Sequence, residues 1–180
     1  MRFHFIAEQW LPHTPSLVFA FFANPQNLPL LLPNWQRARI EQASFIAPSP
    51  RPEGTPRYAA PVAGGGSRIT ISFRALPFIP IRLPWEALIE DFTWNEGFCD
   101  VQQRGPFKYW RHCHTIHSGP PARNGQPGVT LRDEVEYELP LGPLNAFANK
   151  LFVRPQLARI FRHRQQRAAE LLAAAATSRP

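Results

Sequence analysis

The stretch from Gly105 to His117 constrains the fold most, because aromatic and β-branched residues alternate through it with a period of two. Successive side chains of a strand point to opposite faces of the sheet. We therefore expect a strand with one face formed by Trp110, His112, His114 and Ile116. Such a face suits a cavity wall, since proteins seldom bury two adjacent histidines without a partner or a ligand.

A second alternating stretch, Val129 to Leu139, places a single charge, Asp133, on an otherwise apolar face. Since this strand follows the strand 107–118 along the chain, the two are expected to pair, and Asp133 can then meet His112 and His114. A carboxylate beside them would raise the imidazole pKa values. Three interpretations stay open: a structural network that satisfies itself, an anchor for a ligand carbonyl or hydroxyl, and a general acid/base group.

The remaining elements follow from similar patterns. Thr14 and Pro15 predict the start of a short helix, and Asn24-Pro25 ends it and begins a second one that Pro33 closes. The final element is a long helix over 144–176, with Pro155 expected to kink or break it. Its apolar stripe is expected to comprise Leu144, Phe147, Leu151, Leu157, Phe161, Ala168, Leu171 and Leu172. Further strands are predicted over 2–10, 35–43, 68–75, 81–93 and 98–104.

This order predicts an α+β fold with a curved antiparallel sheet of about six to seven strands gripping the C-terminal helix. A chain of 180 residues fits a single domain, here 1–176, with a tail at 177–180. The segment 48–67, rich in Pro and Gly, is expected to be a loop that either caps an opening or is an insertion. Between such a sheet and helix we expect a cavity.

The chain is basic, with a formal net charge of +7. Neither zinc-finger spacing nor a helix-turn-helix signature accompanies that charge, so nucleic acid is not an expected partner. A basic helix surface is predicted to face either solvent or an anionic membrane or acidic protein. It comprises Arg159, Arg162, His163, Arg164 and Arg167.

Cys99 and Cys113 are the only cysteines, and no pattern typical of a signal peptide precedes them. We therefore expect free thiols in a reducing, cytoplasmic location. No cofactor is predicted. A nucleotide site at Gly64-Gly65-Gly66 is not expected, because the segment lacks the Lys-Ser/Thr of a phosphate loop. A metal site is not predicted either, although His-X-His with a carboxylate is a possible ligand set.

The sequence resembles bacterial SRPBCC proteins of the START-like superfamily, which includes pollen-allergen, polyketide cyclase and coenzyme Q-binding families. The resemblance rests on Val18–Phe22, Asn24–Leu28, Trp35, Trp85, Phe98–Gln102, Gly105–Phe107, Trp110–His114, Asp133, Tyr137, Asn149, Leu157, Ile160-Phe161 and Arg164. It implies the helix-grip fold and a ligand cavity, and it says little about the reaction or ligand, because the superfamily serves many functions.

Together these patterns predict that the protein binds or carries a hydrophobic small molecule, such as a lipid, quinone or polyketide-like compound. The alternatives are a cyclase or dehydratase that uses His112 or His114 with Asp133 as acid/base, and a docking module that uses the basic helix. The predicted ligand-binding residues are Trp85, Phe98, Asp100, Gln102, Trp110, His112, His114, Asp133, Tyr137, Phe152, Leu157 and Phe161.

Overall fold

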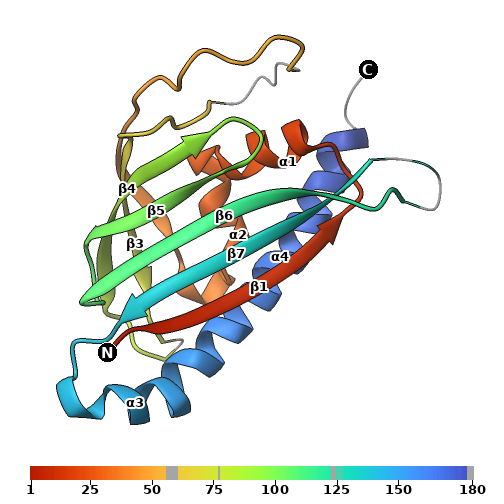
Figure 1. The fold of residues 1–180 in the computed structure, drawn as a ribbon. Helices are drawn as coiled ribbons and strands as arrows, with labels where there is room; N and C mark the ends of the chain where they lie inside the picture. The colour runs from red at the N-terminus through yellow and green to blue at the C-terminus, as the bar shows by residue number, and fades with distance from the viewer. Residues whose placement is uncertain (56–60, 77, 123–124, 126, 178–180) are drawn as a thin grey trace.

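The computed structural model describes residues 1–55, 61–76, 78–122, 125 and 127–177, and the side chains up to residue 175. In these residues one antiparallel sheet has the strand order β1-β7-β6-β5-β4-β3-β2 (Figure 1). This confirms the predicted curved antiparallel sheet. The strands are β1 (Phe3–Leu11), β2 (Arg39–Ser44), β3 (Arg68–Arg74), β4 (Arg82–Thr93), β5 (Gly97–Arg104), β6 (Tyr109–Gly119) and β7 (Gly128–Glu138).

The predicted pair of short helices follows β1. Helix α1 (Pro15–Phe22) begins at the expected cap, where the Thr14 hydroxyl accepts a hydrogen bond from the Leu17 N–H at 3.4 Å. Asn24 caps the next turn in the same way, through the Gln26 N–H at 3.1 Å. That turn, η1 (Pro25–Asn27), continues directly into α2 (Leu28–Leu31).

The prediction for the second strand was wrong at its start. Residues Asn34–Gln36 form a 3-10 turn, η2, and β2 begins only at Arg39. Arg37 has a φ of 46°, a left-handed conformation that a strand cannot contain. The alternating pattern therefore extended the strand through a turn that instead buries the side chain of Gln36.

The C-terminal helical segment is divided where Pro155 was expected to disturb it. The turn η3 (Gly142–Leu144) and helix α3 (Asn145–Ala148) lead into a π turn, η4 (Asn149–Val153), and then α4 (Arg154–Thr177). A π turn adds one residue to the helix, which rotates all following side chains by about 100°.

The rotation divides the predicted apolar stripe. Leu157, Phe161, Ala168 and Leu172 are buried as expected, whereas Leu144, Phe147 and Leu151 are half or more exposed. That part of the prediction was wrong because the buried positions before α4 are Asn145 and Asn149, and the predicted apolar residues lie on other faces of these turns. In addition, α3 lies beyond the ends of β1 and β7, where no sheet covers it (Figure 1).

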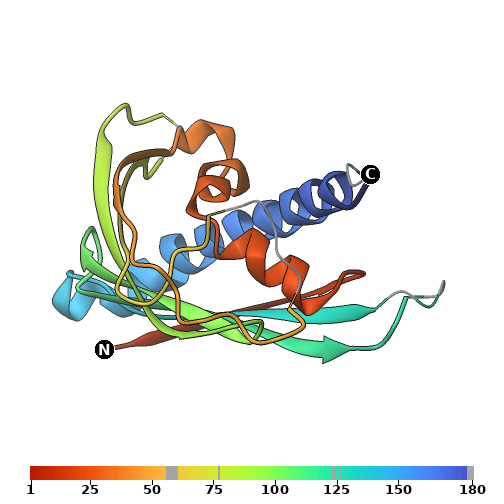
Figure 2. The ribbon, with the colours of Figure 1, turned by 90° about the horizontal axis from the view of Figure 1, so that it is seen from above.

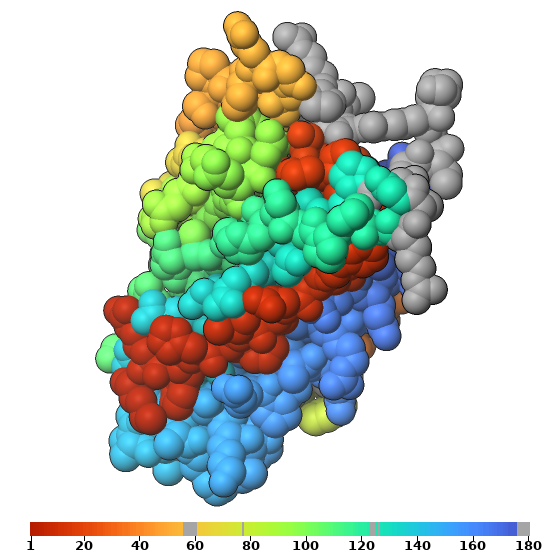
Figure 3. All heavy atoms as spheres, turned by 45° about the vertical axis from the view of Figure 1, so that its right-hand side comes forward, coloured from red at the N-terminus to blue at the C-terminus, as the bar shows by residue number. Residues whose placement is uncertain are grey.

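The sheet bends around α4, and α1 and α2 lie on the same concave side (Figure 2). Strand β1 is at the edge of the sheet and runs between β7 and α4 (Figure 3). Hydrogen bonds close this edge: Gln165 Nε2 donates to the Glu8 carbonyl at 3.0 Å, and Arg154 Nη1 donates to the His4 carbonyl at 3.2 Å. Covering an edge strand in this way blocks pairing with other chains.

The loop 48–67 is anchored at its second half. The Ala63 N–H donates to the Ala23 carbonyl at 3.0 Å, and the Ser67 side chain is fully buried. The prediction that this loop caps an opening rests partly on residues 56–60, which lie outside the described residues. The predicted tail, 177–180, also lies outside them except for its first residue. Among the described residues, no helix is long and apolar enough to cross a membrane.

The expectation of free thiols was wrong for this structure. Cys99 and Cys113 are directly opposite each other on β5 and β6, and they form a disulfide with a Cα–Cα distance of 4.0 Å. Alternation predicted the strand face of each residue but not the register that aligns them. Both side chains lie on the face opposite to His112 and His114, as the alternation predicted.

Candidate functional site

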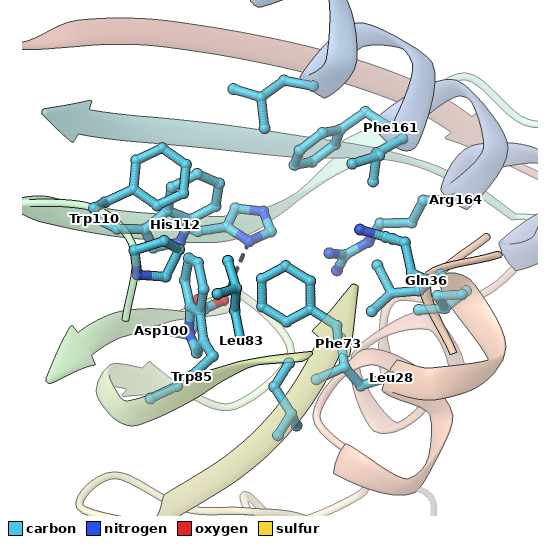
Figure 4. Close-up of a pocket in the computed structure, with 18 of the residues that line it drawn as sticks. Leu28, Gln36, Phe73, Leu83, Trp85, Asp100, Trp110, His112, Phe161 and Arg164 are labelled. Carbon is cyan, nitrogen blue, oxygen red and sulfur yellow. Dashed lines mark ion pairs between the residues drawn. The ribbon is translucent and has the colours of Figure 1, made fainter. Parts of the chain in front are cut away.

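A cavity of about 490 Å³ lies between the concave face of the sheet, α4 and α2 (Figure 4). This volume is in the usual range for small-molecule sites. Aliphatic side chains from several elements form much of its wall, including Leu28, Leu31, Ile69, Ile71, Leu83, Ala87, Ile89, Leu157 and Ile160.

Aromatic rings form the wall at one end of the cavity. The rings of Trp85 and Trp110 meet edge to face with centroids 5.0 Å apart, and Phe107 lies 4.8 Å from Trp110. Phe73 extends this group, 6.0 Å from Trp85. The Trp85–Trp110 pair is edge to face and the other two pairs are tilted, an arrangement that leaves ring faces available for contact with a ligand.

A buried polar cluster interrupts the apolar wall. Asp133 is only 2% exposed, and its Oδ1 atom lies 2.9 Å from His112 Nε2 and 2.7 Å from His114 Nδ1. The contact with His112 has the geometry of a hydrogen bond, while that with His114 is close but poorly aligned. One carboxylate on β7 therefore contacts both inward-facing histidines of β6, His112 and His114, because His114 and Asp133 are direct cross-strand neighbours.

A second carboxylate, Asp100 of β5, approaches the histidines from the other side. The register pairs Asp100 with His112 and Phe98 with His114. Asp100 Oδ1 lies 3.2 Å from His112 Nδ1 and 3.7 Å from His114 Nε2. The ring of His112 is thus enclosed by Asp133 at one nitrogen and Asp100 at the other.

These contacts shift the pKa values of the cluster. Burial opposes ionisation of His112, but the neighbouring Asp100 and Asp133 outweigh it and raise the pKa of the imidazole. Burial also disfavours the charged form of Asp133, yet Arg164 and the two histidines hold its pKa well below the ordinary value. The pKa of Asp100 is lowered for the same reason, mainly through His112, against the effect of burial.

Arg164 belongs to this cluster, although the sequence placed it on the basic outer surface of the helix. It is 8% exposed, and its Nη2 atom lies 3.3 Å from His114 Nε2 and 4.0 Å from Asp133 Oδ1. A guanidinium only donates hydrogen bonds, so His114 Nε2 must be the acceptor. The helical spacing of the sequence could have revealed that Arg164 points inward. It shares one face of the helix with the apolar residues Leu157, Phe161 and Ala168.

Gln36 also lines the cavity, and the sequence analysis missed it. The side-chain oxygen of Gln36 is buried and has no hydrogen-bond partner among the described residues. Trp110 Nε1 and Arg164 Nε are likewise buried and unpartnered in that part of the chain. In the view of Figure 4, Gln36 and Arg164 are on one side of the cavity and Trp110 is on the other. These three polar atoms are buried within the wall, so a bound molecule would form hydrogen bonds with them only after a side-chain movement.

Most of the predicted ligand-binding residues line the cavity: Trp85, Phe98, Asp100, Trp110, His112, His114, Phe152, Leu157 and Phe161. Phe152 is 66% exposed and so lies at the cavity mouth.

Three predicted residues are not part of the lining. Asp133 lies behind the histidines, and Tyr137 is fully buried with its hydroxyl donating to Asn149 Oδ1 at 2.6 Å. Gln102 instead holds the β5–β6 turn, where its Nε2 donates to the Phe107 carbonyl at 2.7 Å. Period-two alternation identified the faces of these strands but not the depth of each side chain.

Comparison with known proteins identifies the fold. No protein-family model and no curated protein matches the chain. Among solved structures, a protein from Thermus thermophilus has a TM-score of 0.59 at 16% identity, covering 96% of this chain and 98% of that one.

Two further solved structures give a similar result. Norcoclaurine synthase from Thalictrum flavum, in complex with dopamine and hydroxybenzaldehyde, has a TM-score of 0.58 at 13% identity, covering 97% of this chain and 88% of that one. A START superfamily protein from Mycobacterium smegmatis has a TM-score of 0.55 at 13% identity, with coverages of 93% and 98%. The chain therefore has the START-like helix-grip fold, as the sequence resemblance implied.

Proposed function

We propose that this protein binds an apolar small molecule in the cavity between the sheet and α4. The single observation that carries this proposal is the cavity itself, about 490 Å³ with aliphatic and aromatic walls and one polar cluster. Such a site excludes water from most of a ligand and orients it through few polar contacts. The polar end of the ligand would meet Asp100, His112 and Arg164, and its apolar part would fill the remaining volume.

Within this class we favour a planar, ring-containing ligand, quinone or polyketide-like, over a lipid acyl chain. Trp85, Trp110, Phe107 and Phe73 provide flat surfaces on which rings can pack. The fold accommodates such molecules elsewhere, since norcoclaurine synthase has been solved with dopamine and hydroxybenzaldehyde. A flexible acyl chain would lose more conformational entropy on binding between fixed rings.

We favour binding or carrying over the cyclase or dehydratase alternative. An acid/base group must reach the proton that it transfers. Asp133 lies behind the cavity wall, and both ring nitrogens of His112 already face carboxylates. Asp100, whose side chain is 22% exposed, is the carboxylate of this cluster that a substrate could contact.

Native mass spectrometry of the purified protein, followed by mild denaturation, tests the proposal by releasing any small molecule that co-purifies. Fluorescence titration then compares a naphthoquinone, a polycyclic aromatic polyketide and palmitate. We expect quenching by the ring compounds at one site per chain and little response to palmitate. Tight palmitate binding without ring-compound binding would contradict the favoured ligand class, and no binding of any probe would contradict a ligand cavity.

Two matched tryptophan variants locate the bound molecule. Trp85→Phe removes an indole from the cavity wall, whereas Trp94→Phe removes one that packs on Phe19 and Phe92 away from the cavity. A clear reduction of the quenching in the first variant, in which Trp110 still lines the cavity, and full quenching in the second support binding in the cavity. The opposite pattern would place the ligand elsewhere.

As a second part of the proposal, the protein exchanges its ligand at an anionic membrane surface. The supporting observation is an exposed apolar segment beside the cavity mouth, formed by Leu141, Leu144, Phe147, Leu151 and Phe152 and accompanied by Lys150 and Arg154. Apolar side chains flanked by basic ones favour the interface of an anionic bilayer. This segment replaces the basic helix face as the expected contact, because Arg164 is buried and Arg167 pairs with Glu170.

Sedimentation with vesicles of phosphatidylcholine and phosphatidylserine tests membrane contact. Leu144→Ser with Phe147→Ser should abolish sedimentation, and Arg159→Glu with Arg162→Glu should reduce it far less. If only the arginine pair matters, the contact is the basic helix. If neither pair changes sedimentation, or the wild-type protein does not sediment, this part of the proposal is wrong.

A cytoplasmic location remains part of the proposal, and Cys99 and Cys113 provide its test. In a reducing compartment the pair would be two thiols, whereas an oxidising compartment would preserve the bridge. Maleimide labelling of denatured protein from rapidly quenched cells should modify both residues. Labelling that appears only after chemical reduction would place the protein in an oxidising compartment.

A further inference from the structure

Three side chains in the cavity wall converge in a way that ligand binding does not require. Asp100, His112 and His114 each offer one donor atom, and these atoms all lie within 4.8 Å of one another. They come from two neighbouring strands, β5 and β6, whose hydrogen-bonded register fixes their backbones. In Figure 4, Asp100 and His112 point toward each other at the cavity. Two imidazoles and one carboxylate are a common ligand set for divalent transition metals.

The distances from Asp100 to the two histidines are close to those in a metal coordination sphere. Asp100 Oδ1 lies 3.2 Å from His112 Nδ1 and 3.7 Å from His114 Nε2. Ligand atoms about 2.1 Å from a metal ion lie about 3.0 to 3.4 Å from each other at octahedral or tetrahedral angles. The two distances from Asp100 are within a few tenths of an ångström of this range. The three donors as a group span up to 4.8 Å, so the two imidazole nitrogens would have to approach each other by up to about 1.4 Å to share one ion.

Asp133 provides an independent indication. Metal-binding histidines usually direct their second ring nitrogen to a carboxylate, which fixes the ring orientation. Asp133 Oδ1 lies 2.9 Å from His112 Nε2 and 2.7 Å from His114 Nδ1, the two nitrogens that face away from Asp100. One buried carboxylate thus lies against both rings on the side away from Asp100, with a hydrogen bond to His112 and a close but poorly aligned contact to His114.

We propose that Asp100, His112 and His114 bind a divalent transition-metal ion at the cavity wall, with Asp133 as the positioning residue. Imidazole donors favour zinc, cobalt or iron over magnesium and calcium, which prefer oxygen ligands. Three protein ligands leave at least one coordination position, and the cavity is the open side of the group. An oxygen atom of a bound molecule, a carbonyl or hydroxyl, could occupy that position.

Arg164 competes with the ion. Its Nη2 atom lies 3.3 Å from His114 Nε2 and donates toward the lone pair that a metal would use. The guanidinium must therefore turn away when the ion binds, and its positive charge opposes the ion as well. The proton between His112 Nδ1 and Asp100 must also leave, because ligating imidazole nitrogens are deprotonated.

Isothermal titration with Zn²⁺, after treatment of the full chain with a chelator, tests the site. We expect one ion per chain. Titration with Co²⁺ should in parallel produce the visible absorption of a cobalt ion bound by nitrogen and oxygen. The measurement needs no organic ligand, so its failure would leave the proposed cavity binding intact. Absence of one-to-one binding in the wild-type protein would overturn the metal proposal.

Variants separate this site from adventitious binding. Asp100→Asn keeps the side-chain shape and removes a ligand charge, and Asp133→Asn keeps the shape and removes the positioning carboxylate. Each should weaken Zn²⁺ binding, the second by roughly 10- to 100-fold. His117→Ala, an exposed histidine on the same strand, is the matched control and should have no effect. Circular dichroism establishes that each variant is folded.

Arg164→Met gives the sharpest test, because a purely structural role for the cluster predicts no gain of affinity. Removing the competing donor and its charge should tighten Zn²⁺ binding by about tenfold or more. Unchanged affinity in both Asp100→Asn and Arg164→Met would assign the ion to another place and overturn the proposal.

Discussion

At the scale of single residues, the most consequential position is Asp133. An ionised carboxylate is costly to bury unless charged partners surround it. His112, His114 and Arg164 provide these partners, and they come from a neighbouring strand and from the helix that crosses it. The same side chain therefore links the sheet to α4 and orients the two histidines that face the cavity.

We expect Asp133→Asn to cost about 3 to 5 kcal/mol at neutral pH, because it leaves buried positive charges without a partner. The folded pKa of Asp133 is below its ordinary 3.8, so the wild-type contribution is complete above that value and is lost as the pH falls through the folded pKa. The variant should thus lose less stability on acidification. Urea unfolding at neutral pH and at a pH of about 2 to 3, below the ordinary pKa of the carboxyl group, measures both effects when a chelator is present.

His112 acts in the opposite sense on the pH profile. Its folded pKa is raised above 6.5, so its contribution is complete below that value and is lost as the pH rises through the folded pKa. The polar cluster therefore stabilises the fold most at pH values between the folded pKa of Asp133 and the folded pKa of His112. An acid limb that is equally steep in wild type and Asp133→Asn would assign acid sensitivity to other groups, with Asp100 as the next candidate.

Tyr137 illustrates a residue that is important for stability but not for the site. Tyr137→Phe removes the hydrogen bond to Asn149 and leaves a buried amide oxygen unpaired, so we expect a loss of about 1 to 3 kcal/mol. Thermal unfolding measures the loss. Ligand affinity should stay unchanged in a fluorescence titration, because the hydroxyl is not part of the cavity lining. A large change in ligand affinity would show that Tyr137 takes part in ligand binding after all.

At the scale of elements, the register of three strands assembles the site. β5 and β6 align Asp100 with His112, and β6 and β7 align His114 with Asp133. A slip by one residue would turn each of these side chains to the outer face. The Cys99–Cys113 bridge spans β5 and β6 on that outer face and opposes such a slip.

Reduction of the bridge should therefore lower stability. For a sequence separation of 14 residues, loop-closure entropy predicts a loss of about 3 kcal/mol. Urea unfolding with and without dithiothreitol measures this loss. A Cys99→Ser/Cys113→Ser variant serves as the control, and its midpoint should not respond to the reductant. Equal midpoints for oxidised and reduced wild type would show that the strand register needs no covalent support.

At the scale of the whole molecule, the cavity results from curvature. A bent sheet and a straight helix cannot be in contact along their full length, and side chains fill only part of the space between them. The buried residues accordingly form two apolar groups, one around Phe19, Leu131 and Leu172 and one around Trp110, Tyr137 and Phe161. The polar cluster lies in the same wall, between these groups along β6 and β7.

Filling the cavity should abolish binding without unfolding the protein. Ala87→Phe places a ring from β4 into the cavity, whereas Ala175→Phe places one on the exposed end of α4. We expect the first variant to lose ligand binding while its stability changes by less than about 1 kcal/mol, since overpacking a filled core would cost about 1 to 3 kcal/mol. The second should bind as wild type. Full binding by Ala87→Phe would place the ligand outside the cavity.

Local patterns in the sequence were sufficient for the order of elements and the face of each strand. Alternation identified His112, His114 and Asp133 as neighbours, and capping residues located α1. These features depend on interactions within a few residues or between adjacent strands. Where local geometry departed from regularity, at the left-handed Arg37 and at the π turn before Pro155, the same patterns predicted a strand start and an apolar stripe that were wrong.

Only the tertiary structure decided what meets across the sheet and the helix. The sequence by itself determined a helix-grip fold and two inward-facing histidines, because hydrophobic periodicity fixes which face of each element is buried. It could not place Asp100 opposite His112, join Cys99 to Cys113 or turn Arg164 inward. Those contacts depend on strand register and on the rotation and docking of α4, which are set by packing among residues far apart in the chain.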